Sequence, residues 1–129
     1  MDVYVNGNNE FRFEADGDFH ADGDVVAFSS TTASDSRLKS DIHTINDALG
    51  TVGKLRGVSY KWLRDGKADI GVIAQEVEEV VPEVVKTKTT LGLDGEEEMK
   101  TVDYGKLVGV LINAINELKA EVEELKGGK

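Results

Sequence analysis

Two residues of this chain, Ser34 and Lys39, have the types and the spacing that nucleophilic chemistry requires. A serine hydroxyl attacks a carbonyl only when a base takes its proton, and a lysine kept neutral by partial burial can act as that base. Residues five apart on an ideal helix point about 140° away from each other, so Ser34 must lie in the loop before a helix for Lys39 to reach it. The nearest target is the carbonyl of Ala33, and the pair therefore predicts self-cleavage of the Ala33–Ser34 bond.

The residues around this pair leave simpler interpretations open. Ser36 or Asp35 could cap the start of a helix, and Asp35 is better suited to a turn and cap than to acid catalysis. Lys39 must lose its charge to act as a base, which requires burial or a nearby positive charge. Arg37 could provide that charge, stabilise the oxyanion or pair with Asp35, and the sequence does not choose among these three roles.

Sequence blocks after Ala33 follow one another in an order that resembles a known family. The blocks are Ser34–Lys39 with Ile42 and Ile45 after it, Gly57–Trp62, Asp69–Val77 and Pro82–Val85. From Ser34 to about Lys126 the chain is similar to the intramolecular chaperone auto-processing domain. That domain is the C-terminal module of bacteriophage tail spikes and tail fibres, including endosialidases, and it also occurs in myelin regulatory factor proteins. The resemblance implies a homotrimeric folding chaperone that cuts itself, in cis, from the assembled fibre upstream, with Ser34 and Lys39 as the catalytic pair.

The chain departs from this family at one position. Some members use a histidine seven residues after the serine, where this sequence has Asp41, and the nearest histidine is His43. A surface histidine without a catalytic role is the simpler interpretation of His43. The other histidine, His20, lies before the resemblance begins, so we predict no Ser-His-Asp triad.

The composition limits the partners. The 129 residues include 25 acidic and 15 basic ones, and the net charge of −10 argues against nucleic acid or an anionic membrane as a partner. The chain has no cysteine, so disulfides and thiolate metal sites are excluded, and we expect no cofactor. No apolar run approaches the roughly 20 residues that span a bilayer, and Met1-Asp2-Val3 does not begin a signal peptide. We expect synthesis in a host cytoplasm during virion assembly, with the fibre part ending in the virion tail and the chaperone part released.

Residues 1–33 are predicted to be the end of a triple-stranded β-fibre stem. The segments Ala15–His20 and Ala21–Val26 echo each other, with glycine at turn positions and short β-prone stretches between. Such a strip cannot bury an apolar face alone, so three chains would have to wind together to cover it. The apolar side chains in question are Phe11, Phe13, Phe19, Val25 and Phe28. The small, polar connector Ser29–Ala33 is typical of a scissile segment.

The Asp-Gly-Asp turns within this strip have two interpretations. Oxygen-rich turns suit calcium, which is a hard cation. Ordinary β-turns use the same residues, and the twelve-residue EF-hand pattern with its closing glutamate is missing. We therefore predict turns and no metal site.

Residues 34–129 are predicted to form a compact α+β domain. Apolar residues at i, i+4, i+7 and i+11 predict a helix that ends at Gly50; they are Leu38, Ile42, Ile45 and Leu49. Alternation over Val58–Trp62 predicts a strand, followed by a turn at Asp65–Gly66. A second helix is expected from about Ile70 to Val81, where Pro82 stops it. Strands are expected at 84–90 and 97–102, around a turn at Asp94–Gly95.

A C-terminal helix at about residues 105–126 is predicted to form a coiled coil. Apolar residues occupy the a and d positions of nearly three heptads: Val108, Leu111, Ile115, Leu118, Val122 and Leu125. Glu121 and Lys126 lie at g and the following e, where they could pair between helices. β-branched residues at a with leucine at d favour two strands, whereas the resemblance implies three. A helix packed on its own domain would show the same stripe.

Three functions follow from these patterns. The first is a trimeric fibre chaperone that is also a self-cleaving serine peptidase acting in cis. The alternative is a trimerisation and capping module of a fibre protein that does not cut itself, with Ser34 as a helix cap. A third is a receptor or glycan binder at the fibre tip, but residues 1–33 lack the clustered aromatic residues that sugar binding usually needs.

Overall fold

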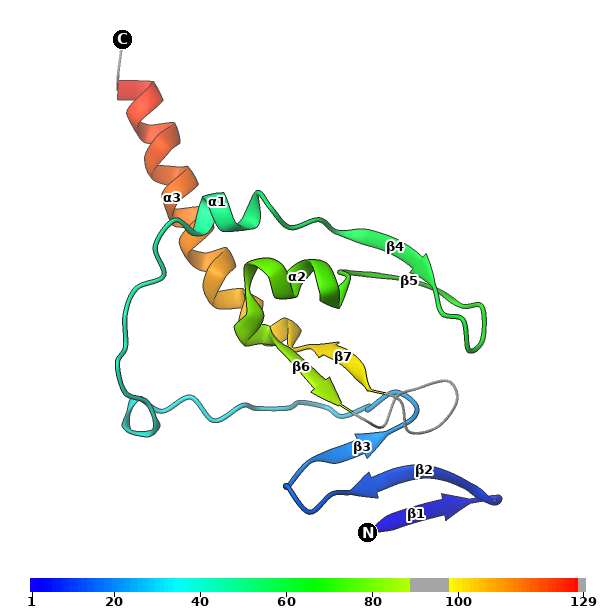
Figure 1. Ribbon diagram of the computed structural model, residues 1–129. Helices are drawn as coiled ribbons and strands as arrows, with labels where there is room; N and C mark the ends of the chain where they lie inside the picture. The colour runs from blue at the N-terminus through cyan, green and yellow to red at the C-terminus, as the bar shows by residue number, and fades with distance from the viewer. Residues whose placement is uncertain (89–97, 128–129) are drawn as a thin grey trace. The chain divides into compact units, whose positions relative to one another are not determined.

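The computed structural model of the chain (Figure 1) describes residues 1–88 and 98–127. The chain divides into two compact units, Met1–Ile42 and His43–Lys129. The sequence-based boundary at Ala33–Ser34 marks the expected cut rather than a change in packing, and it stays a prediction. Among the described residues, no helix is long and apolar enough to cross a membrane.

The first unit begins with a three-stranded antiparallel sheet made within one chain. Its strands are β1 (Asp2–Val5), β2 (Asn8–Phe13) and β3 (Phe19–Ala21), in that order across the sheet. The β1–β2 turn places Asn6 and Gly7 at φ of 52° and 81°, and positive φ at both positions is what a tight hairpin turn requires. The second of the two similar segments, Ala21–Val26, does not form a strand of its own. Ala21 ends β3, and Asp22–Val26 lie outside the sheet.

A single chain leaves the apolar face of this sheet open. The rings of Phe13 and Phe19 pack at a centroid distance of 5.0 Å, yet each side chain is about half exposed. Val25 and Phe28, on the segment that follows, are exposed as well. Within Met1–Ile42, four of the five apolar side chains named in the prediction are thus exposed, and Phe11, which stacks on Phe19, is half-buried.

The helix predicted from Leu38 to Gly50 is wrong. One 3₁₀ turn, η1 (Ser36–Leu38), is followed by extended chain, and α1 begins only at Ala48 (Ala48–Val52). Asp41 and Asp47 have φ of 54° and 51°, a left-handed conformation through which a right-handed helix cannot propagate. Leu38 and Ile42, which suggested an inward stripe, are exposed instead.

In the described part of the second unit, three helices and two antiparallel strand pairs pack around a small core. The helices are α1, α2 (Ala74–Val80) and α3 (Leu107–Gly127), with 3₁₀ turns η2 (Pro82–Val84) and η3 (Tyr104–Lys106). The strands are β4 (Val58–Lys61), β5 (Ala68–Gly71), β6 (Val85–Lys88) and β7 (Met99–Val102), paired as β4–β5 and β6–β7. The core residues are Ala48, Val77, Val81, Val84, Leu107, Val110 and Ala114. This confirms a mixed α and β fold with a long C-terminal helix.

The boundaries around α2 differ from the predicted ones at one end only. Ser59 pairs with Ile70 across β4 and β5, so the residues expected to open the helix belong to a strand. The hairpin turns at Gly66, which has φ of 72°, as the Asp65–Gly66 pair predicted. At its other end α2 stops at Val80, before Pro82, as expected. The predicted strands at 84–90 and 97–102 are confirmed over β6 and β7, and residues 89–97, with the predicted turn at Asp94–Gly95, lie outside the described residues.

Helix α3 carries two apolar stripes, and only one of them packs on its own domain. The buried stripe consists of Leu107, Val110 and Ala114. The second stripe, which we call the heptad stripe, is exposed along its whole length: Val108, Leu111, Ile115, Leu118, Val122 and Leu125. Packing within the described part of His43–Lys129 therefore does not account for the heptad stripe.

Shortening Val77 tests the core. Val77 is 1% exposed, so Val77→Ala should lower the free energy of unfolding by about 2 to 3 kcal/mol through lost burial and a residual cavity. Urea denaturation followed by circular dichroism measures this loss. Leu63→Ala, at a side chain that is 89% exposed, is the control and should cost less than about 0.5 kcal/mol. Equal losses in the two variants would contradict the core assignment.

Candidate functional site

Ser34 and Lys39 are in direct contact. The Lys39 Nζ donates a hydrogen bond to the Ser34 Oγ at 2.7 Å. The turn η1 lies between the two residues and is closed by hydrogen bonds from the Leu38 amide to the Asp35 carbonyl (3.0 Å) and from the Lys39 amide to the Ser36 carbonyl (3.1 Å). A single tight turn, rather than the start of an α-helix, thus brings together two side chains five positions apart.

Asp35 and Arg37 brace this turn. The Asp35 carboxylate accepts hydrogen bonds from the Arg37 amide (2.9 Å), from Nε (3.1 Å) and from Nη2 (3.0 Å). Of the three roles that the sequence left open for Arg37, the structure shows pairing with Asp35. Asp35 is also the N-cap of η1, as the turn-and-cap interpretation expected.

The charges of this pair stabilise each other. Side-chain hydrogen bonds from Arg37, followed by the Arg37 backbone N–H, hold the pKa of the Asp35 carboxyl below its ordinary value. The same side-chain hydrogen bond raises the pKa of the Arg37 guanidinium. Asp35 therefore stays an ionised acceptor near neutral pH, which suits a turn brace better than an acid catalyst.

The dyad of Ser34 and Lys39 is exposed to water in the single chain. Every residue from Asp22 to Asp47 is exposed. A lysine acts as a general base when its surroundings withdraw water from the amine, and the unit Met1–Ile42 by itself does not provide such surroundings. The contact geometry is present, whereas the burial that would complete it is not.

The histidines do not join the dyad. Asp41, at the position where some family members use a histidine, is in a left-handed conformation, and His43 is exposed. Among the residues that the structure describes, no hydrogen bond links His43 to Ser34 or Lys39. His20 instead contacts the Asp22 carboxylate, with 2.6 Å between Nε2 and Oδ1.

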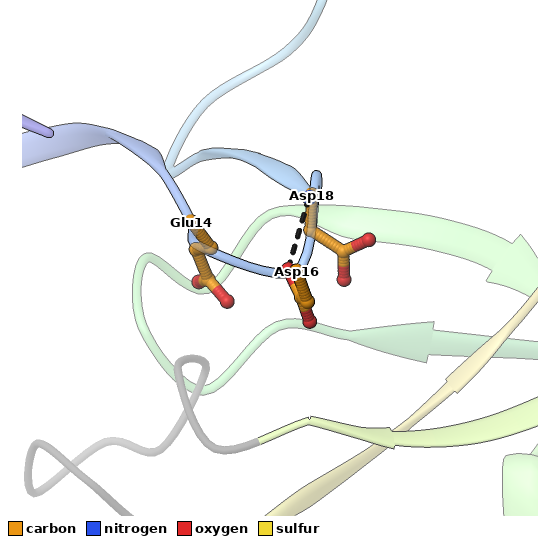
Figure 2. A group of neighbouring side chains, drawn as sticks. All are labelled: Glu14, Asp16 and Asp18. Atoms are coloured by element: carbon orange, nitrogen blue, oxygen red, sulfur yellow. Dashed lines mark hydrogen bonds between the residues drawn. The ribbon is translucent and has the colours of Figure 1, made fainter.

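The first Asp-Gly-Asp motif forms the β2–β3 turn. Figure 2 shows the side chains of Glu14, Asp16 and Asp18 gathered at this turn, and their carboxylate oxygens lie within 4.8 Å of one another. The Asp16 Oδ1 accepts a hydrogen bond from the Asp18 amide at 3.0 Å, and Gly17 has φ of 96°. These are the features of a turn, as predicted; Asp16 is exposed and Glu14 and Asp18 are half-buried, and carboxylates gathered at a turn do not by themselves assign a cation.

Sequence reasoning missed two polar residues of α3 that hold the chain just after the dyad. The Glu117 carboxylate accepts hydrogen bonds from the Ala48 amide (2.9 Å) and the Leu49 amide (3.1 Å). The Asn113 Nδ2 donates to the Ile45 carbonyl at 3.2 Å. The spacing of Asn113 and Glu117 could have indicated that they contact the same segment, because residues four apart lie on one face of a helix.

Comparison with known proteins relates the chain to a chaperone family and to phage tail fibre proteins. Residues 34–86 match the family described as chaperone of endosialidase, so the match begins at Ser34 and includes Lys39. The chain is 33% identical over 132 residues to the long tail fiber protein Gp37 of Enterobacteria phage K3, across 98% of this chain and 10% of that protein. It is 32% identical over 126 residues to Gp37 of Enterobacteria phage M1, across 92% of this chain and 49% of that protein. The chain thus spans about a tenth of the first of these relatives and about half of the second.

Removing the Arg37 guanidinium tests the brace at the turn. Arg37→Gln should move the pKa of Asp35 up toward its ordinary value, because the charged hydrogen bonds that stabilise the carboxylate are lost. Since the folded-state pKa is depressed, the brace acts above the unfolded pKa and is lost as the pH falls through the lower folded value. Titration of the carboxyl carbon by NMR measures the change.

The matched control for this titration is Arg56→Gln. Arg56 pairs with Glu76 through Nε (2.7 Å) and Nη2 (2.8 Å), and this pairing lowers the pKa of Glu76. The control should raise the pKa of Glu76 and leave that of Asp35 unchanged. An Asp35 pKa that does not respond to Arg37→Gln would show that the pair does not form in solution.

Proposed function

Since this chain belongs, through residues 34–86, to the family described as chaperone of endosialidase, we propose that it is an intramolecular chaperone which trimerises and folds a phage tail fibre and then releases itself. The observation that carries the proposal is the 2.7 Å contact of Lys39 Nζ with Ser34 Oγ at the first residue of the family match. The partners are two further copies of the chain and the fibre segment upstream. The place of action is the host cytoplasm during virion assembly.

The proposed reaction is an N-to-O acyl shift followed by hydrolysis. The Ser34 Oγ attacks the carbonyl carbon of Ala33 while the Lys39 Nζ takes the hydroxyl proton. The C–N bond between Ala33 and Ser34 breaks, and the released amine of Ser34 takes a proton. Water then hydrolyses the ester on Ser34 Oγ, which leaves a carboxylate on Ala33 and restores the serine hydroxyl.

The exposure of the dyad supports a reaction that waits for the trimer. A neighbouring copy would bury Lys39 and complete the site, so the cut would follow assembly rather than precede it. Early cleavage would remove the chaperone before it had joined the chains. Cleavage therefore reports that assembly has taken place.

The heptad stripe of α3 supports a coiled coil as the element that joins the chains. Six apolar side chains at a and d positions are 42% to 78% exposed, and burying them between parallel helices would stabilise an oligomer. The residue types at the a and d positions alone favour a coiled coil of two helices. Our proposal of three helices therefore rests on the family resemblance. A short coiled coil takes its number from the domains that it joins.

Joining three chains would lower the barrier to folding the fibre. A triple-stranded fibre nucleates slowly because three chains must come into register before any contact offsets the lost entropy. A trimeric domain raises their effective concentration. The exposed phenylalanines of the N-terminal sheet are then the apolar surface that the assembled fibre covers. After release the fibre would be kept by its slow unfolding.

The second candidate is a trimerisation and capping module that does not cut itself. It is favoured by the cap geometry of η1, in which Asp35 and Arg37 need no catalytic role. The two candidates agree on the trimer and differ only in whether the chain is cut.

Replacing the two dyad residues separates these candidates. The wild-type chain, once trimeric, should yield the pieces 1–33 and 34–129, and Ser34→Ala and Lys39→Met should both stay whole because they lack the nucleophile or the base. Intact mass spectrometry of the purified proteins measures the outcome. Ser36→Ala, in the same turn, is the control and should be cut like the wild type. A cut Lys39→Met chain would refute the dyad, and an uncut wild-type trimer would favour the capping module.

Charging the heptad stripe tests the coiled coil. Leu111→Glu combined with Ile115→Glu should convert the trimer to a monomer, because like charges would face one another at adjacent a and d positions. Sedimentation equilibrium measures the mass. Ala120→Glu, on an exposed outer position of the same helix, is the control and should stay trimeric. A trimer that survives the double change would place the interface elsewhere.

A further inference from the structure

Helix α1 receives its N-cap from a residue far away in the sequence. Its own N-cap residue, Asp47, is in the left-handed conformation and makes no side-chain capping hydrogen bond. The first amides of a helix have no partner within the helix, and a nearby Ser, Thr, Asp or Asn normally satisfies one of them. Here the Glu117 carboxylate accepts from two, those of Ala48 and Leu49, across sequence separations of 69 and 68 residues.

Two further contacts from α3 hold the residues just before this cap. The Asn113 amide donates to the Ile45 carbonyl. Gly109 lies beside the Ile45 side chain, close enough that a methyl group there would make ordinary van der Waals contact with it. Gly109, Asn113 and Glu117 are spaced four apart, so they form one row on α3, which we call the clamp. The clamp is separate from the heptad stripe.

The clamp is the anchor of the segment that carries the dyad. Lys39–Asp47 belongs to no strand or α-helix, and all of it is exposed. Ile45 follows Lys39 by six positions, and a fully extended chain of that length reaches at most about 22 Å. The dyad is therefore tethered to the helix that carries the heptad stripe, by a short chain whose far end is fixed by three hydrogen bonds.

We propose that Asn113 and Glu117 are positioning residues for self-cleavage, because they tie the dyad-bearing segment to the helix that joins the chains. This inference rests on the proposed function above. When the three α3 helices associate, the clamp would keep the end of each dyad segment at Ile45–Leu49 fixed to α3, which would limit the volume that each dyad can sample beside a neighbouring copy. Without the clamp the trimer would still form, but each dyad would sample many positions and the cut would slow.

The test compares variants of the clamp in the full chain. Glu117→Ala removes both acceptors and should slow the cut by about tenfold or more, while Asn113→Ala should slow it less. Glu117→Gln keeps one carbonyl oxygen and should give an intermediate rate. Glu124→Ala is the matched control, since it lies one heptad further along the same face, is exposed, and should cut at the wild-type rate. Intact mass over time gives the rates, and sedimentation gives the oligomeric state.

A readout that does not depend on cleavage separates this inference from the proposed function. Hydrogen exchange of the Ala48 and Leu49 amides should be slow in the wild type and at least about tenfold faster in Glu117→Ala, with the trimer intact. A Glu117→Ala trimer that cuts at the wild-type rate would overturn the positioning role. A wild type that never cuts would overturn the proposed function and the role in cleavage together, and slow exchange at these two amides would show that the clamp itself had formed. Loss of the trimer in both Glu117 variants would assign Glu117 to assembly and overturn positioning.

Discussion

The packing of α3 into the core is the interaction on which the rest of His43–Lys129 depends. Three of the seven core residues found in the described part of the chain, Leu107, Val110 and Ala114, lie on this one helix. Because this stripe faces the domain, the heptad stripe must face away, and the clamp row takes a third direction toward α1. One helix thus organises the core, an exposed apolar stripe and the anchor of the segment that follows Lys39.

In contrast to the packing of α3, the contact between Ser34 and Lys39 depends on local interactions alone. The turn η1, the Asp35–Arg37 pair and the Lys39–Ser34 hydrogen bond all form within six consecutive residues. Local hydrogen bonds fix geometry at little entropic cost, but they cannot exclude water, and exposed ion pairs contribute little stability. The contact between Ser34 and Lys39 therefore has a defined geometry while both side chains stay exposed to water.

Features that depend on contacts between nearby residues in the sequence could be predicted, whereas features that depend on distant residues could not. The meeting of Ser34 with Lys39, the hairpin turn at Gly66 and the end of α2 before Pro82 depend on residues within a few positions, and the structure agrees with them. Other features depend on distant partners. Ile70 is in a strand because it pairs with Ser59, and Glu117 meets α1 across more than sixty residues. The predicted helix after Leu38 failed because an apolar period of four does not reveal the left-handed conformations of Asp41 and Asp47.

Because the turn between Ser34 and Lys39 is formed by local contacts, its geometry does not depend on the residues that precede Ser34. Every side chain that shapes the turn lies at or after Ser34, and the connector before it, Ser29–Ala33, contributes only a small, polar, exposed stretch. A different sequence could replace the residues before Ser34 without altering a single contact of the turn. The turn can therefore keep its geometry behind upstream segments of quite different sequence.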